Sequence, residues 1–123
     1  MADKVPNKER GEIAITLAGQ PLVMRPTPDC AVAIEARTGK GLRALGRRVV
    51  DGEATLTELA AVIFEGLRAA GEPAVLSTVR DAVFKAGYVA IEVPALQLIV
   101  NLASGGRQEA EATGEAKAAG TTS

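Results

Sequence analysis

Few residues of this 123-residue chain are of types that carry out catalysis, and it contains no histidine. Histidine is the usual general base near neutral pH and the commonest metal ligand, so its absence excludes Ser–His–Asp and Cys–His nucleophilic sites. The single cysteine, Cys30, lies in the first turn of an expected helix, where a thiolate would be favoured. A buried, unreactive thiol is the stronger interpretation, because free cysteines usually pack as small apolar residues.

A second stretch with the look of a chemical motif is "RTGKGLRALG", in which Lys40 stands between two glycines before an expected helix. It departs from the phosphate-binding P-loop, because Ile34 stands where a glycine is required, Gly41 replaces the Ser or Thr, and no strand precedes it. Gly39 as a helix stop explains the same residues. The carboxylates fall mostly at expected helix ends or on polar faces, and no pattern pairs them into an acid–base site. We therefore expect no enzyme, no cofactor and no metal.

One cluster of charge is patterned. Five basic residues and no acidic residue lie from Arg37 to Arg48. At about 100° per residue, Lys40, Arg43 and Arg47 share one face of an expected helix, opposite its apolar face. A solvated surface, an acidic protein partner and a nucleic acid all remain open, with nucleic acid the least favoured, because stacking aromatic residues and a broad basic surface are missing.

Composition indicates a single small domain. Apolar residues make up 47% of the chain and aromatic residues only 2%, so the core must be built from Ala, Val, Leu and Ile and stands to gain from self-association. The polar N-terminus has no apolar segment typical of a signal peptide, and no apolar run approaches the roughly 18 residues that span a bilayer. We expect a protein of the cytoplasm with no membrane partner.

The elements that must position these residues are one hairpin and about five helices, which makes the fold class α+β and mostly helical. Residues 11–25 alternate apolar and polar side chains around a short loop with Gly19, the pattern of a β-hairpin. Helix start and stop signals then divide the rest, with Thr55 and Glu58 as a capping box. The expected helices cover about 28–38, 41–51, 56–70, 73–86 and 94–104, between a flexible leader at 1–10 and a disordered tail at 105–123.

The order of these elements resembles a known family. The hairpin in "RGEIAITLAGQPLVMRPT", the helix ending "AIEARTGKGL" and the segment "LGRRVVDGEATLTELAAVIFEGLRAAGE" are similar to the small tail-assembly-chaperone-like proteins of gene transfer agents and related siphophages. The likeness covers about residues 10–72 and depends on the spacing of apolar residues and glycines. One departure is Pro28–Cys30, where relatives tend to begin the helix with more apolar residues.

The resemblance implies a non-enzymatic assembly factor, a chaperone, that binds the tape-measure and tail tube proteins while the tail is built. Some members of the family are called tail tube proteins, so a structural tail component, associated with the virion, is the alternative. A small DNA-binding regulator that uses the basic helix is a third and weaker hypothesis. Strand content separates the first two, because a tube needs a closed ring of extended sheet and only about two strands are evident.

The surfaces expected to bind partners follow from this. A two-stranded hairpin is marginal alone and leaves at least one backbone edge for pairing, which favours self-association by strand addition. The apolar segment "GYVAIEVP" is expected to be a linker that either closes the core or faces a partner. The candidate partner-binding residues are Ile13, Ile15, Leu22, Met24, Lys40, Arg43, Arg47, Tyr88, Val89, Ile91 and Val93.

Overall fold

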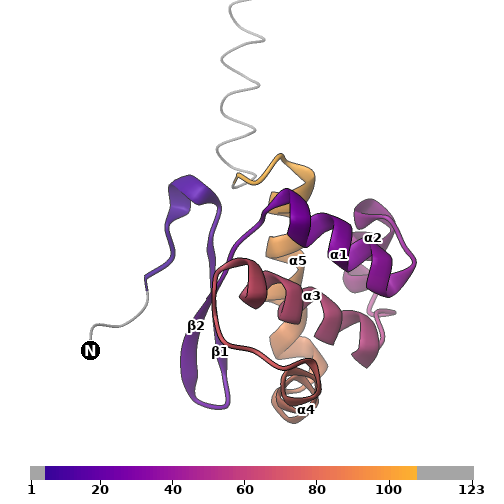
Figure 1. Cartoon of the computed structure of the whole chain (residues 1–123). Coiled ribbons are helices and arrows are strands. Elements are labelled where there is room, and N and C mark those ends of the chain that lie inside the picture. The colour runs from indigo at the N-terminus through magenta and orange to yellow at the C-terminus, as the bar shows by residue number, and fades with distance from the viewer. Residues whose placement is uncertain (1–4, 108–123) are drawn as a thin grey trace, which may run out of the picture.

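The computed structural model describes residues 5–107 and has the predicted fold class, an antiparallel hairpin followed by five helices (Figure 1). In chain order the elements are η1 (Lys8–Arg10), β1 (Ile13–Leu17), β2 (Gln20–Met24), α1 (Pro28–Thr38), α2 (Leu42–Val50), α3 (Leu56–Ala69), α4 (Leu76–Ala86) and α5 (Tyr88–Ala103). The turn between the strands has positive φ at Ala18 and Gly19, as a type I′ hairpin requires. The predicted hairpin is therefore confirmed.

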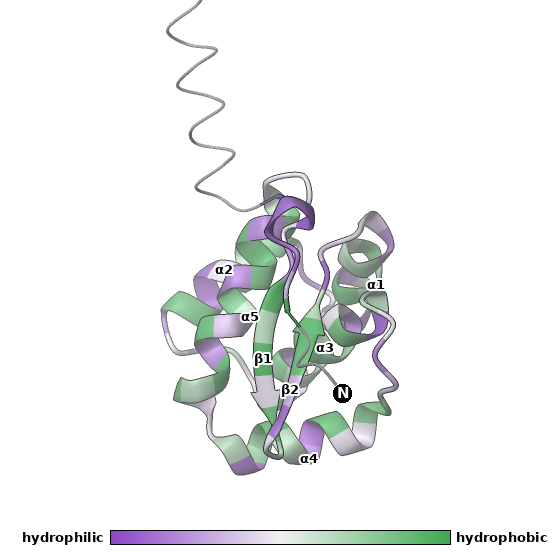
Figure 2. Ribbon diagram, turned by 90° about the vertical axis from the view of Figure 1, so that its left-hand side faces the viewer, coloured by the Kyte–Doolittle hydropathy of each residue, from purple (hydrophilic) through white to green (hydrophobic). Residues whose placement is uncertain are grey.

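Helix α3 is the centre of the molecule and contacts β2, α1, α4 and α5 (Figure 1). Its start is fixed locally, because Thr55 and Glu58 form the predicted capping box. Every residue from Glu58 to Leu67 is buried, so this helix has no solvent face along that length. The hairpin lies beside it (Figure 2), and the apolar residues Ile13, Ile15 and Leu17 of β1 are buried in the core.

The two last helices differ from the sequence-based bounds. Helix α4 begins at Leu76, three residues after the expected start, and Pro73 lies in the preceding loop. Helix α5 begins at Tyr88, so the segment expected to be a linker is its first two turns and Pro94 lies inside the helix. The reason is burial: Ile91 is 2% exposed and packs in the core, which favours helix before Pro94 even though proline removes one backbone bond.

The leader is partly structured. Its residues 8–10 form the short helix η1. The side chain of Asn7 stabilises the start of this helix by accepting a hydrogen bond from the N–H of Glu9. The carboxylate of Glu12 accepts hydrogen bonds from the N–H of Asn7 and from the guanidinium of Arg10. Leader residues 1–4 and most of the expected disordered tail, 108–123, lie outside the described residues. Within residues 5–107 no helix is both long enough and apolar enough to cross a membrane.

At Gly66, α3 approaches its neighbours closely. A Cβ at this position would lie 2.6 Å from Cδ2 of Leu98 and 3.0 Å from Cβ of Met24. The carbonyl oxygen of Gly66 also accepts from the N–H of Arg25, just after β2, at 3.0 Å. The missing side chain therefore lets α3 pack directly against both β2 and α5.

We expect Gly66→Ala to destabilise the protein by about 1–3 kcal/mol, because the methyl group overpacks the contact with Leu98 and Met24. The direction of the change in stability separates packing from helix propensity, because replacing glycine by alanine in an unobstructed helix would stabilise the protein by about 1 kcal/mol. Urea unfolding of the variant and the parent measures the difference. In a double-mutant cycle the cost should shrink in a Leu98→Ala background, and an unchanged or increased stability of Gly66→Ala contradicts the packing account.

Candidate protein-binding surface

The apolar residues of the hairpin, expected to contact partners, lie mostly in the core. Ile13 and Ile15 are each 6% exposed and Met24 is fully buried, while Leu22 is half-buried and packs against the same cluster. A two-stranded sheet cannot hold its apolar face without such cover. Ile13, Ile15 and Met24 therefore stabilise the fold and are not available to a partner, whereas Leu22 stays partly exposed.

The outer edge of β2 is also covered. Pro21 has no N–H, the N–H of Val23 donates to the buried carboxylate of Glu72 at 2.9 Å, and the N–H of Arg25 donates to Gly66. Each outward-facing donor of this edge is thus absent or already bonded. Strand addition at β2, one form of the expected self-association, has no free donor to use.

The edge of β1 is different. Its register with β2 pairs Leu17 with Gln20 across the two-residue turn, so Ala14 and Thr16 direct their N–H groups away from β2. Both residues are exposed, and within residues 5–107 neither N–H has an acceptor. The hairpin therefore keeps one open edge with two donors.

The basic cluster is divided by ion pairs. Lys40 Nζ lies 2.7 Å from Glu58 Oε2, and Arg48 binds the other oxygen of the same carboxylate at 3.0 Å. Arg37 pairs with Glu65, a second buried carboxylate of α3. Three of the five basic residues are thus counter-ions of a core helix. The expectation that Lys40 belongs to a free cationic face is wrong.

Glu58 is the clearest electrostatic site in the molecule. Burial raises the pKa of its carboxyl, but hydrogen bonds from Lys40, from the N–H of Thr55 and from Arg48 outweigh burial and lower the pKa from 4.5 to about 2. The carboxylate therefore both caps α3 and holds the loop before α2 and the end of α2 onto it. The expectation that the carboxylates lie on polar faces is wrong for Glu58, Glu65 and Glu72, which are buried.

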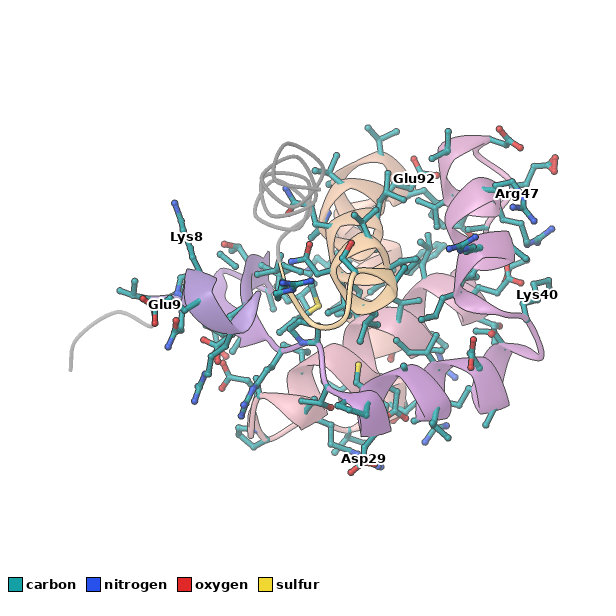
Figure 3. The ribbon with its side chains drawn as sticks, turned by 90° about the horizontal axis from the view of Figure 1, so that it is seen from above. Lys8, Glu9, Asp29, Lys40, Arg47 and Glu92 are labelled. Atoms are coloured by element: carbon teal, nitrogen blue, oxygen red, sulfur yellow. The ribbon has the colours of Figure 1, made fainter. Side chains whose placement is uncertain are left out.

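Arg43 and Arg47 are the two cations of α2 that stay exposed. Within the part of the chain that the structure describes, neither forms an ion pair or a side-chain hydrogen bond. Figure 3 shows Arg47 on the outer side of α2, pointing away from the body of the protein. These two guanidinium groups are free to meet an acidic group of another molecule.

A groove lies beside them, between α2 and α5. It measures about 410 Å³, and its lining residues are mostly apolar: Leu42, Arg43, Gly46, Arg47, Val50, Asp51, Leu96, Ile99, Val100 and Ala103. Gly46 has no side chain to fill it, and Ile99 forms a buried part of its wall. The groove was not foreseen, although Val50 at the end of an amphipathic helix and the apolar run 98–100 were visible signals in the sequence.

The remaining candidate residues lie on the first two turns of α5. Ile91 is buried, whereas Tyr88, Val89 and Val93 are 41%, 80% and 61% exposed. Phe84, near the end of α4, is 69% exposed as well. The corner where α4 meets α5 therefore presents apolar side chains to solvent, which in a small protein is typical of a contact surface.

Cys30 is an inert core residue. Its side chain is 2% exposed, and burial raises the pKa of its thiol to about 12, so the thiolate is disfavoured at neutral pH. The buried interpretation is confirmed. Within residues 5–107 no three Cys, Asp or Glu side chains gather where they could hold a metal ion.

Replacing Glu58 by glutamine should alter the pH dependence of stability. Because folding lowers the pKa of this carboxyl from 4.5 to about 2, its stabilisation is complete above pH 4.5 and is lost as the pH falls toward 2. The contribution is about 3 kcal/mol at most. We expect Glu58→Gln to be less stable at pH 7 by about 2–3 kcal/mol and to show a flatter loss of stability between pH 5 and 2.

Urea unfolding across that pH range measures this. The matched control is Glu53→Gln, at an exposed position of the same segment, which should stay within about 0.5 kcal/mol of the parent. If Glu58→Gln loses stability on acidification as steeply as the parent does, the ion pairs with Lys40 and Arg48 are not the cause of the lowered pKa.

One comparison with known proteins identifies the family of this chain. A family model described as "Phage tail tube protein, GTA-gp10" matches residues 10–106, which takes in the hairpin and all five helices. No curated protein and no solved structure matches the chain. Because the matched residues make up most of the sequence, this chain belongs to the family of the phage tail tube protein GTA-gp10 and is a tail-related protein of phages and gene transfer agents.

Proposed function

We propose that this chain is a structural component of the tail of a phage or gene transfer agent and acts by binding other tail proteins, without catalysis. The family match over residues 10–106 carries the proposal, since the family's description is that of a tail tube protein. The expected partners are tube subunits, further copies of the chain and, from the resemblance noted above, the tape-measure protein. A component of this kind is associated with the virion once the tail is complete.

A second candidate is an assembly factor, the chaperone-like role first suggested by the sequence. It is favoured by the strand content: residues 5–107 contain one two-stranded sheet, and the β2 edge is covered by Glu72 and Gly66. A tube wall made of continuous sheet needs strands on both edges of each subunit. An assembly factor needs only accessible contact surfaces and would act in the cytoplasm.

A DNA-binding regulator has less support. Arg37, Lys40 and Arg48 neutralise buried carboxylates of α3, which leaves Arg43 and Arg47 as the free cations of the cluster within the described residues. Two guanidinium groups are a weak electrostatic footprint for a duplex, since specific proteins usually make several phosphate contacts.

Quantitative mass spectrometry of purified particles distinguishes the two leading candidates. A structural component should be present in many copies per particle, in constant ratio to the other tail proteins. An assembly factor should be abundant in unfinished tails from lysates and nearly absent from finished particles. A cytoplasmic host protein of similar mass, measured in the same samples, gives the background of contamination. Absence of the chain from both fractions would contradict both candidates.

A further inference from the structure

An apolar strip runs along the outer side of α5. It consists of Val89, Val93, Leu96, Val100 and Ala103, which are exposed or half-buried. Successive members are separated by four, three, four and three residues, the spacing of a coiled-coil seam. At 1.5 Å per residue the strip is about 21 Å long. A strip with this spacing matches the contact face of another helix better than that of a loop or a flat sheet.

The second wall of the same surface comes from α2. Leu42, Gly46 and Val50 are spaced by four residues and line the groove of about 410 Å³ together with the end of the α5 strip. Val50 is 68% exposed although it is apolar. A Cβ at Gly46 would lie 3.3 Å from Cγ2 of Ile99, so the absence of a side chain there lets α2 and α5 pack closely beneath the groove. Two helices with a hollow seam between them are the usual receptor for a third helix.

The charged residues that line the groove are mainly basic. Arg43 and Arg47 stand one turn apart on α2 and have no acidic partner within residues 5–107, while Asp51 lines one end. Lys40 and Arg48 on the same segment are paired with Glu58, so the exposed charge lies beside the groove. An occupant with carboxylates flanking its apolar residues would complement this rim.

We propose that the groove between α2 and α5 binds an amphipathic α-helix of another protein, with apolar residues at heptad spacing and acidic residues beside them. The apolar residues would lie between the α5 strip and Val50, and the acidic residues would pair with Arg43 and Arg47. That the partner is a tail protein depends on the proposed function, whereas the chemistry of the groove does not.

A second copy of the chain fits the groove less well. In a two-fold dimer formed through this surface, two copies of the same rim would meet, each with the two cations Arg43 and Arg47 and the single acid Asp51. Like charges brought together in this way oppose association. The charge of the rim therefore favours a different, acidic helix.

A synthetic helix tests the proposal with the full-length chain. The probe has Leu at the a and d positions of three heptads and Glu at e and g, which also keeps it from pairing with itself. A matched probe carries Lys at e and g. We expect the acidic probe to bind saturably by fluorescence anisotropy and to shift the NMR signals of α2 and α5, and the basic probe to bind at least about tenfold more weakly.

Two valines of nearly equal exposure provide the matched variants. Val50 is 68% exposed at the groove, and Val32 is 66% exposed on α1. Val50→Lys adds a cation, so attraction by charge alone would strengthen binding of the acidic probe. Docking in the apolar groove instead predicts a loss of about tenfold or more, with Val32→Lys unchanged. Arg43→Glu combined with Arg47→Glu should reverse the preference between the two probes.

Each other outcome overturns the proposal. Lack of saturable binding, equal binding of the two probes, or binding that Val50→Lys leaves intact excludes an acidic helix in this groove. If the chain alone is a dimer that Val50→Lys makes monomeric, the occupant is a second copy. None of these results depends on particles, so failure here is distinguishable from absence of the chain from the finished tail.

Discussion

The burial of α3 on all sides is the constraint on which the rest of the structure depends. Ten consecutive residues, Glu58 to Leu67, are buried, and the two carboxylates among them cannot be desolvated without counter-charges. The segment around α2 supplies those charges through Lys40 and Arg48, and α1 supplies Arg37. The arrangement of α1 and α2 over α3 is therefore set by ion pairing as well as by apolar contact.

This constraint also determines which charges are left for binding. Lys40 and Arg48 are held inward by Glu58, whereas Arg43 and Arg47, between them in sequence, are exposed beside the groove. Figure 3 shows Arg47 on the outer side of α2. Because Lys40 and Arg48 are neutralised by Glu58, the exposed positive charge of this segment is limited to Arg43 and Arg47 and does not form a broad basic face. Such a patch adds orientation and selectivity to an apolar contact more than it adds affinity.

Local signals made most of the fold predictable. The capping box of Thr55 and Glu58 and the alternation of apolar and polar residues in 11–25 each involve residues close together in the sequence. The helix and the hairpin that they predict are both present. The errors arise from partners distant in sequence. Glu72 bonds the backbone of Val23, 49 residues away, and no local pattern reveals that it closes a strand edge. Of the binding surface, the exposed cations of α2 could be predicted from helical spacing. Val50 and the apolar run 98–100 indicate apolar surface, but the sequence does not show that they lie side by side where α2 meets α5.

The edges of the hairpin limit how copies of this chain can be joined. A ring of continuous sheet requires each subunit to offer two open edges, but β2 has its outward donors removed or bonded at Pro21, Val23 and Arg25. Within residues 5–107 only the β1 edge of the hairpin has free outward donors. Backbone pairing between β1 edges can therefore join two copies but cannot add a third. Assembly into a tail beyond such pairs must therefore use side-chain surfaces, and the largely apolar groove between α2 and α5 is a surface of that kind.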